Sequence, residues 1–384
     1  MRVDQCYSIA DFRTLARKRL PRPVFDFLDG GAEDEVTLRH NRDDFDTVQL
    51  VPRVLTGVSD VDMSSTLLGQ KVSVPLMLSP TGMNRMFHNH GERAVSRAAE
   101  RFGLFYSLST LSTVSIEEIA RLNSGPNCFQ IYIHKDRGLS RHFINRCKDA
   151  GYAALSLTVD TTIGGNRERD LRNGMTIPPR FSWSDLLSFA THARWSLEHF
   201  VHGDITLANL VDMAGKDGKL QSIYAYVGEQ LDAAVTWNDA KEMIQQWGGP
   251  FAIKGLVSVE DAKRAVDIGA SAIILSNHGG RQLDGGCSAF YQLPAIVDAV
   301  GGKIEIIVEG GVRRGTHIAK AISLGATAVA MGRGYLYALA AGGQAGVERA
   351  LERLIAEYRR DLMLLGCAST QDLGPHLVRS APQR

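Results

Sequence analysis

The chain has 384 residues, of which 44% are hydrophobic and 22% are charged, and its formal net charge is +1. This composition is typical of a folded globular protein, and the near-zero charge argues against a nucleic-acid-binding surface. There is no signal-peptide pattern and no run of roughly eighteen apolar residues, so a cytoplasmic location is the default expectation. The five cysteines are scattered and form no CxxC pair, which favours neither a disulfide framework nor a metal site.

The first 73 residues predict a helical cap. Ser8 can begin a helix with the sequence SIADFRTLARKRL, and the prolines at positions 21 and 23 end that helix and start a second one. The second helix is expected to stop at Gly30 and Gly31. We expect one domain over residues 1–384, with this cap (1–73) in front of the main body (74–370).

The main body alternates eight short apolar runs with amphipathic stretches. Segments between the runs, such as SVEDAKRAVDIG, place apolar residues at helical spacing. Eight strand-helix repeats favour a closed (β/α)8 TIM barrel over a doubly wound sheet. Residues 168–237 are too long for one connection and predict an excursion over the barrel mouth. The runs cover residues 74–80, 104–109, 128–133, 154–160, 251–255, 272–277, 305–311 and 328–333.

Polar side chains gather at the carboxyl ends of these predicted strands. That end of a TIM barrel carries the active site, and chance would scatter polar residues over both ends. The residues concerned are Thr81, Ser109, Gln130, Tyr132, Thr158, Asp160, Lys254, Ser276, His278, Glu309 and Arg333.

The last two rim segments indicate a phosphate site. EGGVRRG (309–315) and MGR (331–333) bring backbone amides and arginines to the corner where barrels hold phosphate, although their glycines could serve only tight turns. No strand is followed by GxGxxG, and GxxxxGK[ST] is absent, so a mononucleotide is favoured over a dinucleotide or nucleoside triphosphate. Lys254 could stabilise negative charge on a reduced flavin, or form a structural salt bridge.

His278 follows the sixth run in SNHGGRQLDG, with Arg281 three residues later. A base beside a planar guanidinium suggests proton removal from an acid substrate next to its carboxylate. Asp160 could orient the imidazole, and Arg167 could give the carboxylate clamp a second arm. A local salt bridge between Asp160 and Arg167 is the alternative.

SNHGGRQLDG, TVD followed by RERD, FQIY, IKG, GGVRRG and GGAEDEVTL together resemble the FMN-dependent (S)-2-hydroxy acid oxidase and dehydrogenase family, from about residue 8 to residue 370. The resemblance implies that His278 is the base, that Asp160 is its partner and that Arg167 and Arg281 clamp the substrate carboxylate. Tyr132 would donate a hydrogen bond to the substrate. Whether the base takes the α-proton or the hydroxyl proton stays open.

The resemblance also implies an FMN site in which Lys254 faces the N1 and O2 edge of the flavin. Gly82 is shared by dehydrogenases and by some oxidases, so both quinone and oxygen remain acceptors, and we favour a dehydrogenase. The other implied cofactor contacts are Pro80, Thr81, Gly82, Ser109, Gln130, Thr158 and Ser276, with Glu309, Gly310, Gly311, Arg313, Gly332 and Arg333 on the ribityl and phosphate side.

The pattern is nearest to the mandelate and L-lactate dehydrogenases. The stretch HARWSLEHFVHG is similar to the excursion that lies on the membrane in those relatives, so residues 181–212 could touch a membrane through Trp183, Phe189, Trp195 and Phe200, or form a lid on the barrel. Relatives are commonly tetramers, which implies a homotetramer here.

Two departures from the family bear on the substrate. Phe27 replaces a tyrosine that reaches the substrate carboxylate, and Glu309 replaces an aspartate. Leu111 and Gly164 replace bulkier residues of glycolate-handling relatives, so an aromatic or bulky acid such as mandelate, or else lactate, is expected. Two alternatives stay open, namely a flavin barrel that acts on a larger substrate such as a peptide, and a decayed non-catalytic flavin-binding protein.

Overall fold

The computed structural model describes residues 1–176, 179–203, 205–211 and 232–381. Eight parallel strands form a closed barrel in the order β10, β11, β4, β5, β6, β7, β8, β9. This confirms the predicted (β/α)8 fold, and each strand falls on a predicted apolar run. The strands are β4 (Leu76–Leu78), β5 (Phe105–Ser109), β6 (Asn127–Ile131), β7 (Ala154–Thr158), β8 (Phe251–Leu256), β9 (Ala272–Leu275), β10 (Glu305–Glu309) and β11 (Ala328–Met331).

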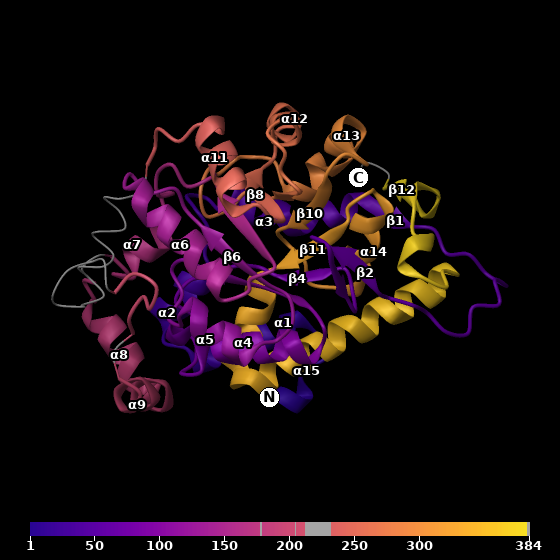
Figure 1. The fold of residues 1–384 in the computed structure, drawn as a ribbon. Helices are drawn as coiled ribbons and strands as arrows, with labels where there is room; N and C mark the ends of the chain where they lie inside the picture. The colour runs from indigo at the N-terminus through magenta and orange to yellow at the C-terminus, as the bar shows by residue number, and fades with distance from the viewer. Residues whose placement is uncertain (177–178, 204, 212–231, 382–384) are drawn as a thin grey trace.

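Helices surround the barrel because each strand is followed by an amphipathic segment whose apolar face packs on it (Figure 1). Several of these helices begin at a side chain that accepts a backbone N–H, as Ser115, Thr236, Ser258 and Ser288 do. The outer helices are α4 (Gly91–Arg101), α5 (Ile116–Leu122), α6 (Arg137–Asp149), α11 (Trp237–Trp247), α12 (Val259–Asp267), α13 (Ala289–Val300), α14 (Gly315–Ser323) and α15 (Arg333–Leu365).

A short hairpin closes the amino-terminal end of the barrel. It consists of β2 (Ser65–Leu67) and β3 (Gln70–Val72), which the sequence analysis did not predict. Leu67 and Leu68 are fully buried among the inward side chains of the strands, and the Leu68 N–H donates to Glu305 Oε2 at 2.8 Å. Apolar packing therefore fills this end, and the polar side chains gather at the opposite end.

The amino-terminal cap consists of α1 (Ile9–Arg19), α2 (Arg22–Asp29) and α3 (Val36–Asp43). As predicted, Ser8 caps α1 and Gly30 ends α2. Asp29, at the end of α2, is buried and accepts from Arg13 at 2.6 Å, from Tyr337 at 2.7 Å and from Arg169 at 3.2 Å. Burial alone would raise its pKa, but these donors lower the pKa of Asp29 to about 2. The end of α2 is therefore held firmly beside the barrel mouth.

The predicted excursion begins with α7 (Glu168–Arg172), α8 (Trp183–Thr191) and α9 (Ala193–Val201). Figure 1 shows α8 and α9 projecting from the barrel at the lower left. Residues 177–178, 204 and 212–231 of the predicted span lie outside the described residues. None of the helices in the described ranges is long and apolar enough to cross a membrane. The chain also pairs β1 (Val48–Leu50) with β12 (Val378–Ser380).

Candidate active site

A cavity of about 1190 Å³ opens at the carboxyl ends of the barrel strands. Two of the predicted site residues, Asp160 and Ser276, are absent from its lining and lie behind it, where they contact other predicted residues. The predicted residues that line the cavity are Phe27, Pro80, Thr81, Gly82, Ser109, Leu111, Gln130, Tyr132, Thr158, Gly164, Arg167, Lys254, His278, Arg281, Glu309, Gly310, Gly311, Arg313, Gly332 and Arg333.

His278 lies just after β9 in a left-handed conformation with φ 58°, which is uncommon for a residue with a side chain. Its backbone N–H donates to Ser276 Oγ at 3.0 Å, and its Nδ1 lies 3.0 Å from Asp160 Oδ1. Burial alone would raise the pKa of Asp160, but His278 and Lys254 lower it. An ionised Asp160 fixes the imidazole through Nδ1 and would stabilise its cation, which suits a general base.

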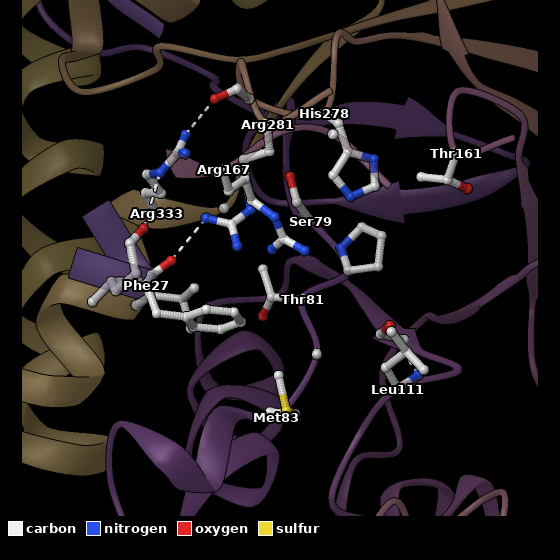
Figure 2. Close-up of a pocket in the computed structure, with 18 of the residues that line it drawn as sticks. Phe27, Ser79, Thr81, Met83, Leu111, Thr161, Arg167, His278, Arg281 and Arg333 are labelled. Carbon is white, nitrogen blue, oxygen red and sulfur yellow. Dashed lines mark hydrogen bonds between the residues drawn. The ribbon is translucent and has the colours of Figure 1, made fainter. Parts of the chain in front are cut away.

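The two predicted clamp arginines converge on Phe27. The guanidinium carbons of Arg281 and Arg167 lie 4.9 Å and 5.8 Å from the centre of its ring. Figure 2 shows both guanidinium groups in the space between Phe27 and His278. Asp160 pairs with His278, as the resemblance implied, and the alternative salt bridge between Asp160 and Arg167 is not formed.

The carboxyl end of α2 holds two arginines through backbone carbonyls. Arg281 donates to the oxygens of Phe27 at 2.7 Å and Gly30 at 3.2 Å, while Arg333 donates to those of Leu28 at 3.0 Å and Gly30 at 2.6 Å. Arg333 also donates to the Gly279 oxygen at 2.7 Å. The negative pole of a helix favours cations at this end. In the structure Arg333 joins α2 to the His278 loop, a role that its expected place on the phosphate side did not suggest.

Lys254 and Glu309 form an ion pair inside the barrel, with Nζ 2.5 Å from Oε1. Ser276 Oγ donates to the same carboxylate oxygen at 2.8 Å and accepts from Lys254 Nζ at 3.2 Å. Burial alone would raise the pKa of Glu309, but Lys254 and Ser276 lower it. Both groups of the pair are therefore charged.

Several groups in the cavity match the needs of FMN. In the described part of the chain, Gln130 Nε2 and Thr158 Oγ1 are buried without a hydrogen-bond partner, which suits the polar edge of a flavin ring. Arg313 is partly buried, and no carboxylate among the described residues lies within ion-pair distance of it, so a phosphate would supply the missing charge. Gly311 has φ 73°, and a Cβ there would meet the Asn41 oxygen at 1.6 Å, so this turn requires glycine.

Asp170 is a site residue that the sequence analysis missed. Its buried Oδ2 lies 3.6 Å from Arg167 and 3.9 Å from Arg281. Burial raises the pKa of Asp170 even though both arginines oppose that shift. Its place three residues after Arg167 in RERD was the available signal. The sequence analysis also missed an apolar wall of the cavity, formed by Met83, Met86, Phe87, Leu171 and Met175.

Comparison with known proteins agrees with this geometry. The family model described as FMN-dependent dehydrogenase matches residues 16–380. An L-lactate oxidase of Nostoc sp. is 40% identical over 370 residues, covering 95% of this chain and 96% of that relative. An L-lactate dehydrogenase of Alcaligenes faecalis is 40% identical over 376 residues, covering 98% and 99% of the two chains.

A crystal structure of the monotopic membrane protein (S)-mandelate dehydrogenase superposes with a TM-score of 0.95 at 38% identity, and the match covers 98% of this chain and 100% of that one. Sequence, fold and cavity thus agree over nearly the full length. The chain belongs to the FMN-dependent dehydrogenase family and is a flavin enzyme with FMN as its cofactor.

Proposed function

We propose that the enzyme oxidises an (S)-2-hydroxy acid with an aromatic or bulky side chain to the 2-keto acid. The observation that carries this proposal is the convergence of His278, Arg281 and Arg167 on one cavity. It is supported by the lactate and mandelate enzymes among the relatives. The pairing of His278 with Asp160 argues against a decayed, non-catalytic protein.

The residues have separate tasks in this proposal. Arg281 and Arg167 bind the substrate carboxylate, and Asp170 behind them limits the positive charge left over when no acid is bound. His278 takes a proton from the substrate, and Asp160 stabilises the resulting imidazolium. Tyr132, which lines the cavity, donates a hydrogen bond to the substrate. When bound, FMN would supply the acceptor for the two electrons that leave the substrate carbon.

The strand ends would hold FMN. Lys254 and the unpartnered donors of Gln130 and Thr158 line the cavity and would face the flavin ring, while Gly310, Gly311 and Arg313 would hold the ribityl and phosphate groups. Pro80, Thr81 and Gly82 line the same cavity from the loop after β4. The α14 helix begins just beyond Arg313, and the positive pole of its amino-terminal end favours phosphate.

The cavity wall favours a bulky substrate side chain. Leu111, Met83, Met86 and Phe87 present apolar atoms around the space next to the clamp. At Gly164 a Cβ would meet no atom within 4 Å, so the mouth is wide at this position. An aromatic ring gains free energy by burial against such a wall, whereas lactate leaves most of it uncovered. We therefore rank mandelate-like acids above lactate.

The test is anaerobic mixing of the purified yellow protein with (S)-lactate, (S)-mandelate, 4-hydroxymandelate and a long-chain 2-hydroxy acid. We expect bleaching of the flavin absorbance, fastest with an aromatic acid, and reoxidation by a quinone analogue faster than by air. An enzyme for a larger substrate would stay yellow with all four acids. A colourless protein that takes up no FMN would contradict the proposal itself.

We infer peripheral membrane contact through α8 and α9. Trp183 and Phe200 are each 87% exposed, and Leu187, Leu197 and Val201 are also exposed on these helices. Exposed aromatic and aliphatic side chains on a projecting helix pair suit the headgroup boundary of a bilayer. Phe189 and Trp195, expected to share that surface, instead pack together inside the pair, and Trp195 Nε1 donates to the Met86 oxygen. The homotetramer stays a prediction.

The double variant Trp183→Ser, Phe200→Ser is expected to lose binding to anionic lipid vesicles and to keep its rate of flavin reduction. Both side chains are exposed, so their loss removes apolar contact with lipid without disturbing the barrel. Co-sedimentation with vesicles measures the effect, and Tyr291→Ser, an exposed aromatic on α13, is the matched control. Equal sedimentation of all three proteins would contradict membrane contact through this pair.

A further inference from the structure

Lys254 forms a buried ion pair with Glu309. Glu309 ends β10 and reaches across to β8, where its Oε1 lies 2.5 Å from Nζ, and the side chains are only 4% (Lys254) and 11% (Glu309) exposed. Burial alone would lower the pKa of Lys254, but the carboxylates of Glu309 and Asp160 raise it. The ammonium is therefore charged and compensated by groups of this chain.

The length of Glu309 makes this contact possible. An aspartate at the same backbone position would hold its carboxylate about 1.5 Å further back, the length of one carbon–carbon bond. Ser276 reinforces the contact by donating to the same oxygen, and the Ser276 hydroxyl also accepts from the backbone N–H of His278. The ion pair is thus joined to the loop that carries the base.

We propose that Glu309 tunes the flavin by partly neutralising Lys254, so that the bound cofactor is a weaker oxidant than it would be beside an unpaired lysine. This inference rests on the proposed placement of FMN next to Lys254. A reduced flavin carries negative charge at its N1 and O2 edge, which a nearby cation stabilises. A carboxylate beside that cation opposes the stabilisation, because Coulomb energies of opposite sign add.

The experiment compares the flavin of the parent protein with that of Glu309→Gln, Glu309→Asp and Glu305→Gln. Two quantities are measured anaerobically at pH 6, the midpoint potential against a reference dye and the dissociation constant for sulfite. Sulfite donates the electron pair of its sulfur to flavin N5. The adduct then carries negative charge at the N1 and O2 edge, as the reduced flavin does. The midpoint potential and the sulfite dissociation constant therefore both report the electrostatic potential at that edge, without any turnover of substrate.

Glu309→Gln is expected to have a more positive potential and to bind sulfite about tenfold more tightly, because one negative charge beside Lys254 is gone. In Glu309→Asp the potential and the sulfite affinity should change in the same direction but by less, because the carboxylate keeps its charge and lies further from Lys254. Glu305→Gln is the matched control. Glu305 begins β10 at the opposite end of the barrel, where it accepts from Leu68, and its replacement should change neither quantity.

A second measurement at pH 9 separates charge from structure. A buried Lys254 without Glu309 would release its proton at a lower pH than in the parent, so the difference between parent and Glu309→Gln should shrink as the pH rises. Glu309→Gln that holds FMN with unchanged potential and sulfite affinity at pH 6 would overturn this inference. If that variant does not retain FMN, an unchanged Glu309→Asp would overturn it instead. A parent protein without FMN would overturn the proposed function.

Discussion

Replacing His278 with alanine is expected to leave FMN bound and to slow anaerobic flavin reduction by a 2-hydroxy acid at least about a hundredfold. The imidazole lies at the cavity edge and is held by Asp160, so its removal takes away the base without disturbing the strands that hold the cofactor. Stopped-flow absorbance measures the reduction rate, and the visible spectrum of the purified variant measures the retained flavin.

Two further variants test whether the loss of rate in His278→Ala comes from loss of the base. Asp160→Asn keeps a side chain of the same shape but loses the charge that stabilises the imidazolium, so an intermediate loss of rate is expected. His142→Ala, on the exposed face of α6, should behave as the parent. Reduction of the His278→Ala flavin at near the parent rate would show that another group removes the proton.

Replacing Arg281 with lysine is expected to raise KM for a hydroxy acid by roughly ten to a hundredfold, the cost of a lost hydrogen bond to a charged group. Lysine keeps the charge but lacks the planar fork that can bind a carboxylate while also donating to the Phe27 and Gly30 oxygens. Steady-state kinetics with a quinone analogue as acceptor measure the change. For the methyl ester of the same acid, which has no carboxylate, KM of Arg281→Lys should rise much less.

Phe27→Tyr tests the carboxylate clamp of Arg281 and Arg167 in the opposite direction, by adding a hydrogen-bond donor. Its ring already lies against both guanidinium groups, so a hydroxyl there would offer a donor near the substrate carboxylate. KM for the acid should fall, by up to about tenfold, while KM for the ester stays constant. An equal loss of acid and ester turnover in Arg281→Lys would mean that the arginine acts through the fold rather than through the carboxylate.

The barrel was predictable because its signals are local. Each strand is a short apolar run that ends in polar residues, and parallel strands in a barrel bring those ends to one face. Consequently the sequence analysis named His278, Lys254, Gln130 and Thr158 as neighbours, although they are far apart in the chain. The closing hairpin of β2 and β3 was missed because its strands have three residues each and little periodicity.

The unpredicted parts of the site depend on which of several possible partners a side chain reaches. The residue pattern alone left Asp160 free to pair with Arg167 or with His278; the family resemblance implied His278, and the structure confirms that pair. Glu309 was expected on the ribityl side of the flavin, but it also reaches Lys254 across the barrel. On α8 and α9, helical periodicity turns Phe189 and Trp195 inward and leaves Trp183 and Phe200 exposed.

The most direct test of the account is a crystal structure of the FMN-loaded enzyme with benzoylformate, the keto acid that corresponds to mandelate. We predict that its carboxylate lies within hydrogen-bond distance of both Arg281 and Arg167, that its ring lies against Leu111 and Met86, and that His278 faces the 2-oxo carbon. A carboxylate held elsewhere, or an imidazole turned away from that carbon, would show that His278, Arg281 and Arg167 do not form the substrate site.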